Sequence, residues 1–159
     1  MILITYSPEK PASEKVALYA LKEFMRLEGA PDANGAEYLH DENGAPYFSG
    51  EDMPYVSVSH SGDYVVAAVS RFPVGIDVQR QKSIDFKSVC RRFDIDASDE
   101  KSFYEKFAAA EAKTKALRTP LAESLKSDNS DVAVFGFIPG YTLALFGEGT
   151  PFFTEYFPD

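Results

Sequence analysis

The chain has 159 residues, of which 45% are hydrophobic and 14% aromatic, so it is long enough to bury one sizeable core, and we expect a single domain over 1–159. Its formal net charge of −9 argues against nucleic acid as a partner, because phosphate contacts need a positive face. A single cysteine excludes an internal disulfide and no membrane-length apolar run is present, so we expect a cytoplasmic protein that does not enter a membrane.

The first third of the chain predicts a strand, a helix and a turn-rich stretch. Residues 1–7 alternate weakly and indicate a strand, whereas residues 13–28 place apolar side chains at helical spacing. Gly29 then predicts the end of that helix. Residues 30–54 are rich in Gly, Pro, Asn and Asp, which indicates turns around a short strand at 37–40.

Three strands are expected next, at residues 55–59, 64–70 and 74–78. In the third strand, side chains alternate between two faces, so Asp77 and Gln79 lie on the same face. That face could simply be exposed to solvent, which accounts for alternate polar residues without any function. It could instead be a shelf for a cation, since Gly75 leaves room beside the backbone and oxygen ligands suit Mg²⁺ or Ca²⁺.

A second amphipathic helix is expected over 98–117, capped by Ser98 or Asp99, and a strand hairpin about a Pro-Gly turn follows it. On this helix Glu111 and Lys115 are four residues apart, the favourable order for an ordinary surface ion pair. They also border the apolar stripe of the helix. We therefore expect them where the helix meets the sheet.

His60 lies between two serines at the turn that follows the first of the three strands. A histidine in a turn is commonly solvated or hydrogen-bonded locally. The hydroxyls of Ser59 and Ser61, with the amide of Gly62, would also suit a phosphate. Neighbours in sequence rarely converge as nucleophile, base and orienter, so we do not interpret this stretch as a hydrolase triad.

Four motifs occur in the order typical of the 4′-phosphopantetheinyl transferase superfamily. Its two-lobed, surfactin-synthetase-activating members carry Gly-Lys-Pro, Ser-His-Ser, Gly-Ile-Asp-x-Glu and, on a helix, Trp-x-x-Lys-Glu-Ala-x-x-Lys. This chain resembles them through GAPYF at 44–48, SHSGD at 59–63, VGIDVQ at 74–79 and FAAAEAKTK at 107–115. The resemblance implies an α+β fold with two pseudo-symmetric lobes, about 1–71 and 72–150, each a helix packed on an antiparallel sheet.

The resemblance also implies a reaction, the Mg²⁺-dependent transfer of 4′-phosphopantetheine from coenzyme A to a serine of an acyl or peptidyl carrier protein. It implies metal ligands at Asp77, Gln79 and Glu111 and a coenzyme A site at Ser59, His60 and Lys115. Glu111, which could accept the serine proton, and Lys115 are then the catalytic residues. Two fused lobes are consistent with a monomer.

The motifs depart from the family pattern at Ala45 and Ala110 in place of lysines, Gln79 in place of an acid and Phe107 in place of tryptophan. These changes leave a second interpretation open, a non-catalytic relative that binds coenzyme A or a carrier protein. A folded module without a small-molecule site would require the motif order to be accidental. The basic residues Lys87, Arg91 and Arg92 are expected to meet an acidic carrier protein.

Overall fold

The structure is a computed structural model that describes residues 1–158 and has a mixed α+β architecture. Its strands are β1 (Ile2–Ser7), β2 (Tyr38–His40), β3 (Pro46–Phe48), β4 (Tyr55–Ser61), β5 (Tyr64–Ser70), β6 (Val74–Arg80), β7 (Ala133–Phe135), β8 (Tyr141–Gly147) and β9 (Pro151–Glu155). Its helices are α1 (Ser13–Glu28), α2 (Phe86–Phe93), α3 (Glu100–Leu117) and α4 (Leu121–Lys126). Within the described residues, no helix is both long and apolar enough to cross a membrane.

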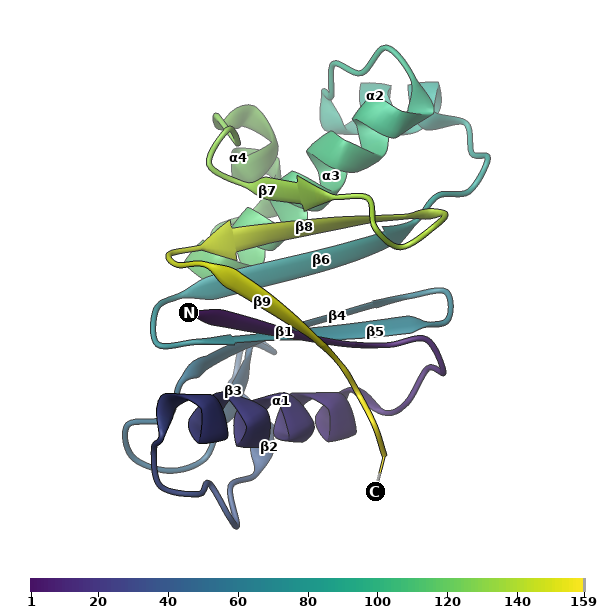
Figure 1. The fold of residues 1–159 in the computed structure, drawn as a ribbon. Coiled ribbons are helices and arrows are strands. Elements are labelled where there is room, and N and C mark those ends of the chain that lie inside the picture. Colours follow the sequence, from purple (N-terminus) through teal and green to yellow (C-terminus); the bar gives the residue numbers. More distant parts are fainter. Residues whose placement is uncertain (159) are drawn as a thin grey trace.

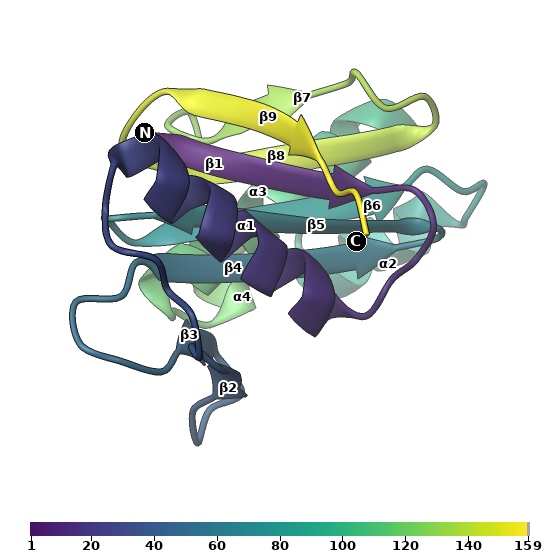
Figure 2. The ribbon, with the colours of Figure 1, turned by 60° about the horizontal axis from the view of Figure 1, so that its bottom comes forward.

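The first sheet has the strand order β4-β5-β1-β9, and α1 packs on one of its faces (Figures 1 and 2). Helix α1 buries an apolar stripe that includes Val16, Leu21 and Phe24, and it ends at Gly29 in the left-handed conformation, as predicted. Strand β9 pairs with β1 in parallel. The expectation of a purely antiparallel sheet is therefore wrong, because the end of the chain returns to the first sheet.

The second sheet has the order β6-β8-β7, and α3 contacts β6 and β8 (Figure 1). The predicted hairpin is confirmed, since β7 and β8 pair antiparallel and Gly140 of the Pro-Gly turn has a φ of 78°. Helix α3 begins after Asp99, whose side chain accepts a hydrogen bond of 2.7 Å from the backbone N–H of Ser102. Of the two predicted caps, Asp99 is the one used.

The two sheets are joined at their edge strands β4 and β6 by side chains rather than by a backbone ladder. Three hydroxyls of β4 accept hydrogen bonds from backbone N–H groups of β6, Ser57 from Ile76 at 3.0 Å, Ser59 from Val78 at 3.1 Å and Ser61 from Arg80 at 2.9 Å. We call these residues the serine ladder. It satisfies donors that the edge of a sheet would otherwise leave unpaired, and it fixes β6 beside β4.

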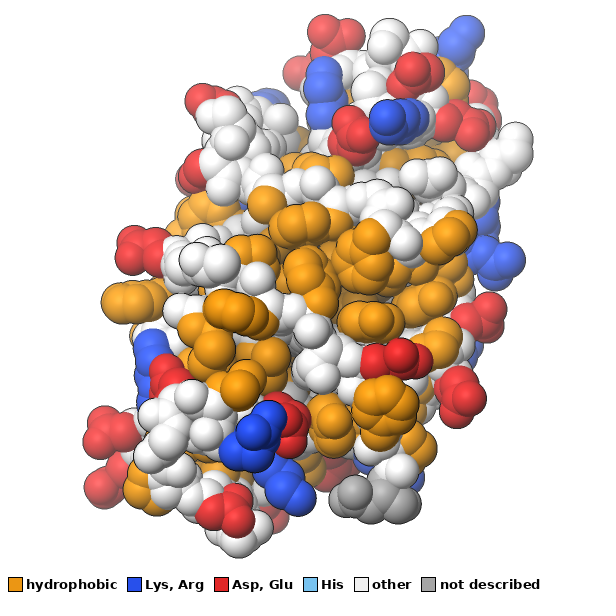
Figure 3. Space-filling view, viewed as in Figure 1, with side chains coloured by type: hydrophobic (Ala, Val, Ile, Leu, Met, Phe, Trp, Pro, Cys, Tyr) orange, Lys and Arg blue, Asp and Glu red, His pale blue; other side chains and the backbone are white. Residues whose placement is uncertain are grey.

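On the face shown in Figure 3, hydrophobic side chains gather over the middle of the molecule. Phe153 of β9 makes edge-to-face ring contacts with Phe135, at a centroid distance of 5.3 Å, and with Phe137, at 5.0 Å. Phe137 also meets Tyr6 of β1 at 5.7 Å. These rings bring side chains of β1 and β9 against β7 and the residues after it, so aromatic contacts link the two sheets here as well.

Candidate functional site

Asp77 is the centre of the candidate site, and it is buried rather than exposed. Asp77 is 3% accessible to solvent, because α3 covers the face of β6 that carries its side chain. The exposed-strand interpretation of this face is therefore wrong. The room expected beside Gly75 is also absent: a Cβ at this position would lie 1.7 Å from the carbonyl oxygen of Ala112. Gly75 serves the close approach of the helix backbone, not of a ligand.

Three side chains donate hydrogen bonds to the Asp77 carboxylate. Its Oδ1 accepts from Ser59 Oγ at 3.0 Å and from Lys115 Nζ at 2.9 Å, and its Oδ2 accepts from Gln79 Nε2 at 2.7 Å. Lys115 Nζ also donates to the carbonyl oxygen of Ile76 at 3.0 Å. A buried charge is tolerated only when it is paired and hydrogen-bonded, and Asp77 meets both conditions.

Glu111 lies on α3 within the electrostatic influence of Asp77. Burial, followed by the negative charge of Asp77, raises the pKa of the Glu111 carboxyl, and the Lys115 ammonium opposes this rise. The ion pair that Lys115 makes is with Asp77, at 2.9 Å, so an ordinary surface pair with Glu111 does not describe its role. The structure thus joins Asp77, Gln79 and Lys115 by hydrogen bonds and places Glu111 where the charges of Asp77 and Lys115 act on it, while the roles expected of these residues stay predictions.

Ser59 has a different task in this structure from the phosphate contact expected of it. Its hydroxyl donates to Asp77 and accepts from the N–H of Val78, and the residue is buried. The side chain therefore orients the aspartate and belongs to the serine ladder. His60, its neighbour in β4, is exposed and lines the pocket described next, so its phosphate contact stays a prediction.

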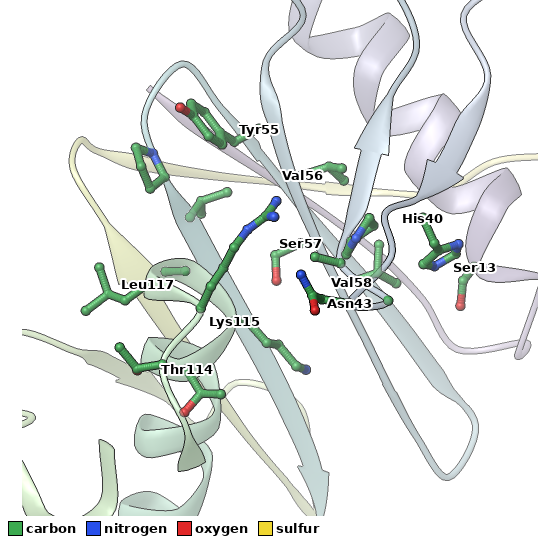
Figure 4. Close-up of a pocket in the computed structure, with 18 of the residues that line it drawn as sticks. Ser13, His40, Asn43, Tyr55, Val56, Ser57, Val58, Thr114, Lys115 and Leu117 are labelled. Carbon is green, nitrogen blue, oxygen red and sulfur yellow. The ribbon is translucent and has the colours of Figure 1, made fainter. Parts of the chain in front are cut away.

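A pocket of about 1070 Å³ lies between β4, the β2–β3 hairpin and the C-terminal end of α3 (Figure 4). This volume is of the size that takes a nucleotide-like ligand. Basic side chains in its wall are His40, His60, Lys115 and Arg118, and none of the described lining residues is an aspartate or glutamate. The lining thus offers N–H donors to an anion in a protein with a net charge of −9, with Lys115 paired to Asp77 and Arg118 to Asp41 behind it.

The turn that carries the GAPYF sequence forms part of the same wall, through Gly44, Ala45 and Pro46. Ala45 has no charge to offer a ligand. Ala110, the other position where the family has a lysine, is fully buried in the core and does not line the pocket. The absence of a lysine at 45 therefore bears on the pocket, whereas alanine at 110 suits the packing of α3.

A comparison with curated proteins supports the superfamily suggested by the motifs. The 4′-phosphopantetheinyl transferase psf-1 of Bacillus pumilus is 43% identical to this chain over 54 residues. The matched segment covers 34% of this chain and 23% of that transferase. No protein-family model matches the chain.

Sequence reasoning missed Arg118 and Asp41, which form an ion pair of 2.5 Å beside the pocket. Neither belongs to a motif, and the two residues are 77 positions apart. A weak signal exists for Arg118, a long cationic side chain directly after the last residue of the motif-bearing helix. No comparable signal marks Asp41, whose side chain accepts from the backbone N–H groups of Asn43 and Ala45 as in an ordinary turn.

Proposed function

We propose that this chain is a 4′-phosphopantetheinyl transferase of the two-lobed type, with the first and second sheets as the cores of its lobes. It would transfer 4′-phosphopantetheine from coenzyme A to a serine hydroxyl of an acyl or peptidyl carrier protein. The partial match to a transferase supports the general activity. The substrate, the metal and the carrier protein belong to the proposal alone.

The observation that carries the proposal is a pocket whose lining is basic and contains no acid, next to the carboxylates of Asp77 and Glu111, of which the first acts electrostatically on the second. Coenzyme A carries a pyrophosphate and a 3′-phosphate, so it needs a large pocket with cationic side chains. The attack on its pyrophosphate needs a carboxylate that can accept a proton and a means to neutralise phosphate charge. Lys115 connects the two features that support the proposal, because it lines the pocket and pairs with Asp77.

The donor set fits Mg²⁺, because this ion takes one or two carboxylates and completes its coordination with substrate phosphates and waters. Across residues 1–158 no cluster of three or more His, Cys, Asp or Glu side chains is placed to hold a metal by itself. Asp77 and Glu111, with the amide oxygen of Gln79, would hold the ion. Bound there, it would neutralise charge on the pyrophosphate during transfer.

Glu111 is the residue suited to accept the proton of the carrier serine. Without a metal, burial and the charge of Asp77 raise its pKa, and a bound Mg²⁺ would oppose that rise. As the serine oxygen bonds to the phosphorus that bears pantetheine, the bridging P–O bond breaks and adenosine 3′,5′-bisphosphate leaves. Lys115 is placed to hold phosphate oxygen while it orients Asp77.

The test is incubation of the purified protein with coenzyme A, Mg²⁺ and a panel of apo acyl and peptidyl carrier proteins. Intact-mass spectrometry of the carrier should show the added phosphopantetheine, and the modification should be lost without coenzyme A. Asp77→Asn should lose it too, because the neutral amide keeps the size of the side chain but not its charge. Failure to modify any carrier, with no binding of coenzyme A, would contradict the proposal.

A second candidate is a non-catalytic relative that binds coenzyme A or a carrier protein. The observation in its favour is that Lys115, Gln79 and Ser59 already bond the Asp77 oxygens, and that Gln79 replaces an acid. A metal would have to displace some of these donors. Binding of coenzyme A that is insensitive to Mg²⁺, without transfer to any carrier, would favour this candidate.

A further inference from the structure

Arg118 ends α3 in an unusual backbone conformation at the wall of the pocket. Its φ is 57°, in the left-handed region where helices commonly place glycine as the residue after the last turn. Asp94 ends α2 in the same conformation, with a φ of 56°, so the case for Arg118 rests on the place and the partner of its side chain. That side chain is 55% exposed and lines the pocket.

The guanidinium of Arg118 reaches across to the loop between β2 and β3. Its Nη1 donates to Asp41 Oδ2 at 2.5 Å, while Asp41 Oδ1 accepts from the N–H groups of Asn43 and Ala45, each at 2.9 Å. The N–H of Ala45 is the main cause that lowers the pKa of Asp41, so the carboxylate is charged at neutral pH. Arg118 therefore lies directly beside the turn in which the family has lysine and this chain has Ala45.

Lys115 and Arg118, the lysine and the arginine of the pocket wall, differ in how many of their N–H donors are still available to a ligand. Lys115 Nζ bonds both the buried Asp77 and the carbonyl oxygen of Ile76. Arg118 is more exposed, and a guanidinium has five N–H donors in a fork that matches phosphate oxygens. The residues that line the described part of the pocket include no acidic side chain, so the negative charge that an entering phosphate meets at Arg118 is that of its partner Asp41.

We propose that Arg118 is a phosphate-binding residue of this pocket and supplies the positive charge that a lysine at position 45 would supply. In the absence of ligand Asp41 binds the guanidinium and holds it in place, and an anionic ligand competes with Asp41 for it. The choice of coenzyme A as that ligand rests on the proposed function. The phosphate site itself requires only an anion with closely spaced phosphoryl groups.

The test is calorimetric titration of coenzyme A and of inorganic pyrophosphate into the parent protein and three variants. Arg118→Gly removes the cation and suits the left-handed backbone, so it should weaken both ligands about tenfold without lowering the Tm. Asp41→Asn keeps an oxygen that can accept from Asn43 and Ala45 but removes the competing charge, so it should tighten both ligands several-fold. Arg26→Ala is the control for net charge, because Arg26 is exposed on α1, outside the pocket wall, and should leave both affinities unchanged.

The outcomes separate this inference from the proposed function. If the parent binds coenzyme A and Arg118→Gly binds it equally well, Arg118 is not a phosphate residue, although the proposed function stands. If only pyrophosphate binds, and Arg118→Gly weakens it, the phosphate site stands and coenzyme A is the wrong ligand. Weakening by Asp41→Asn as large as that by Arg118→Gly would show a structural clamp and overturn the inference, as would a parent that binds neither ligand.

Discussion

Glu111 is a half-buried carboxylate, and burial, followed by the charge of Asp77, raises its pKa above the ordinary value. Because its pKa is raised in the folded state, the contribution of Glu111 to stability is largest at low pH and is lost as the pH rises through the folded pKa. We expect Glu111→Gln to raise the Tm at pH 7, by at most about 4 °C, since solvent screening limits the effect. Thermal unfolding followed by circular dichroism from pH 4 to 8, without Mg²⁺, measures this difference.

The pH profile distinguishes this effect from general stabilisation by glutamine. The difference in Tm between variant and parent should shrink toward pH 4, where the parent carboxyl is neutral too. Glu105→Gln is the matched control on the same helix, because the Glu105 side chain is 42% exposed and lies 3.9 Å from Lys101. A pH-independent rise in Tm for Glu111→Gln, or an equal rise for Glu105→Gln, would contradict the charge argument.

The sequence predicts which side chains share the site wherever the period of a helix or strand fixes the face on which a side chain lies. Asp77 and Gln79 are two apart on a strand, and Glu111 and Lys115 are four apart on a helix, so each pair has a common face. The partner of Lys115 could not be read in the same way. Its pairing with Asp77 depends on the approach of α3 to Gly75, a tertiary contact that periodicity does not contain.

The serine ladder has a buried end, at Ser57, and an exposed end, at Ser61. Ser57→Ala removes the acceptor of the Ile76 N–H, which is buried and without access to water, so it should lower the free energy of unfolding by about 1–3 kcal/mol. Ser61→Ala removes the equivalent acceptor at the exposed end of the ladder, where water can replace it. Its effect should stay within about 0.5 kcal/mol.

Urea denaturation of the parent and the two alanine variants, with unchanged m-values, measures these free energies. The chemical change is identical in both variants, so the contrast isolates burial of the N–H group. Equal losses at the two positions would mean that the hydroxyls act through general packing, and no loss at Ser57 would mean that the ladder does not hold β6 against β4.

The elements that the sequence predicts are those with a long period or a clear cap. Helices α1 and α3 have both, and β4, β5 and β6 have alternation or strong strand residues. Helices α2 and α4 are short, and β9 is defined by its parallel pairing with β1 from the other end of the chain. Pairing at that sequence separation depends on the assembled sheet, so no local sequence pattern predicts it.

In the whole molecule, α3 runs from the contact with α2 to the pocket, and the residues of the candidate site lie along it. Near its N-terminal end, Phe103 and Phe107 pack against α2 through ring contacts at 6.5 and 6.1 Å. Glu111 follows Phe107 by about one turn, roughly 6 Å of helix rise, and Arg118 ends the helix at the pocket. Along α3, Glu111 thus lies between the residues that contact the basic helix α2 and the residues that line the pocket.

On the proposed function, helix α2 offers a surface for the carrier protein. Arg91 and Arg92 of α2 are exposed in a net-acidic protein and offer an acidic carrier protein a local positive surface. Reversal of both to glutamate should slow carrier modification about three- to tenfold at low salt, because charges at the rim of an interface chiefly affect the association rate. Added salt should diminish the difference as the charges are screened.

Initial rates at subsaturating carrier protein, measured at two ionic strengths, provide the test. Lys22 and Arg26, exposed on α1 of the other sheet, are the matched control, since reversing them changes the net charge by the same amount away from α2. If both double variants slow modification equally, the effect reports net charge, and the surface on α2 is not the carrier site. If only the α2 variant is slowed, and its coenzyme A affinity equals that of the parent, the carrier protein approaches the carboxylate pair from the end of α3 that lies opposite the pocket.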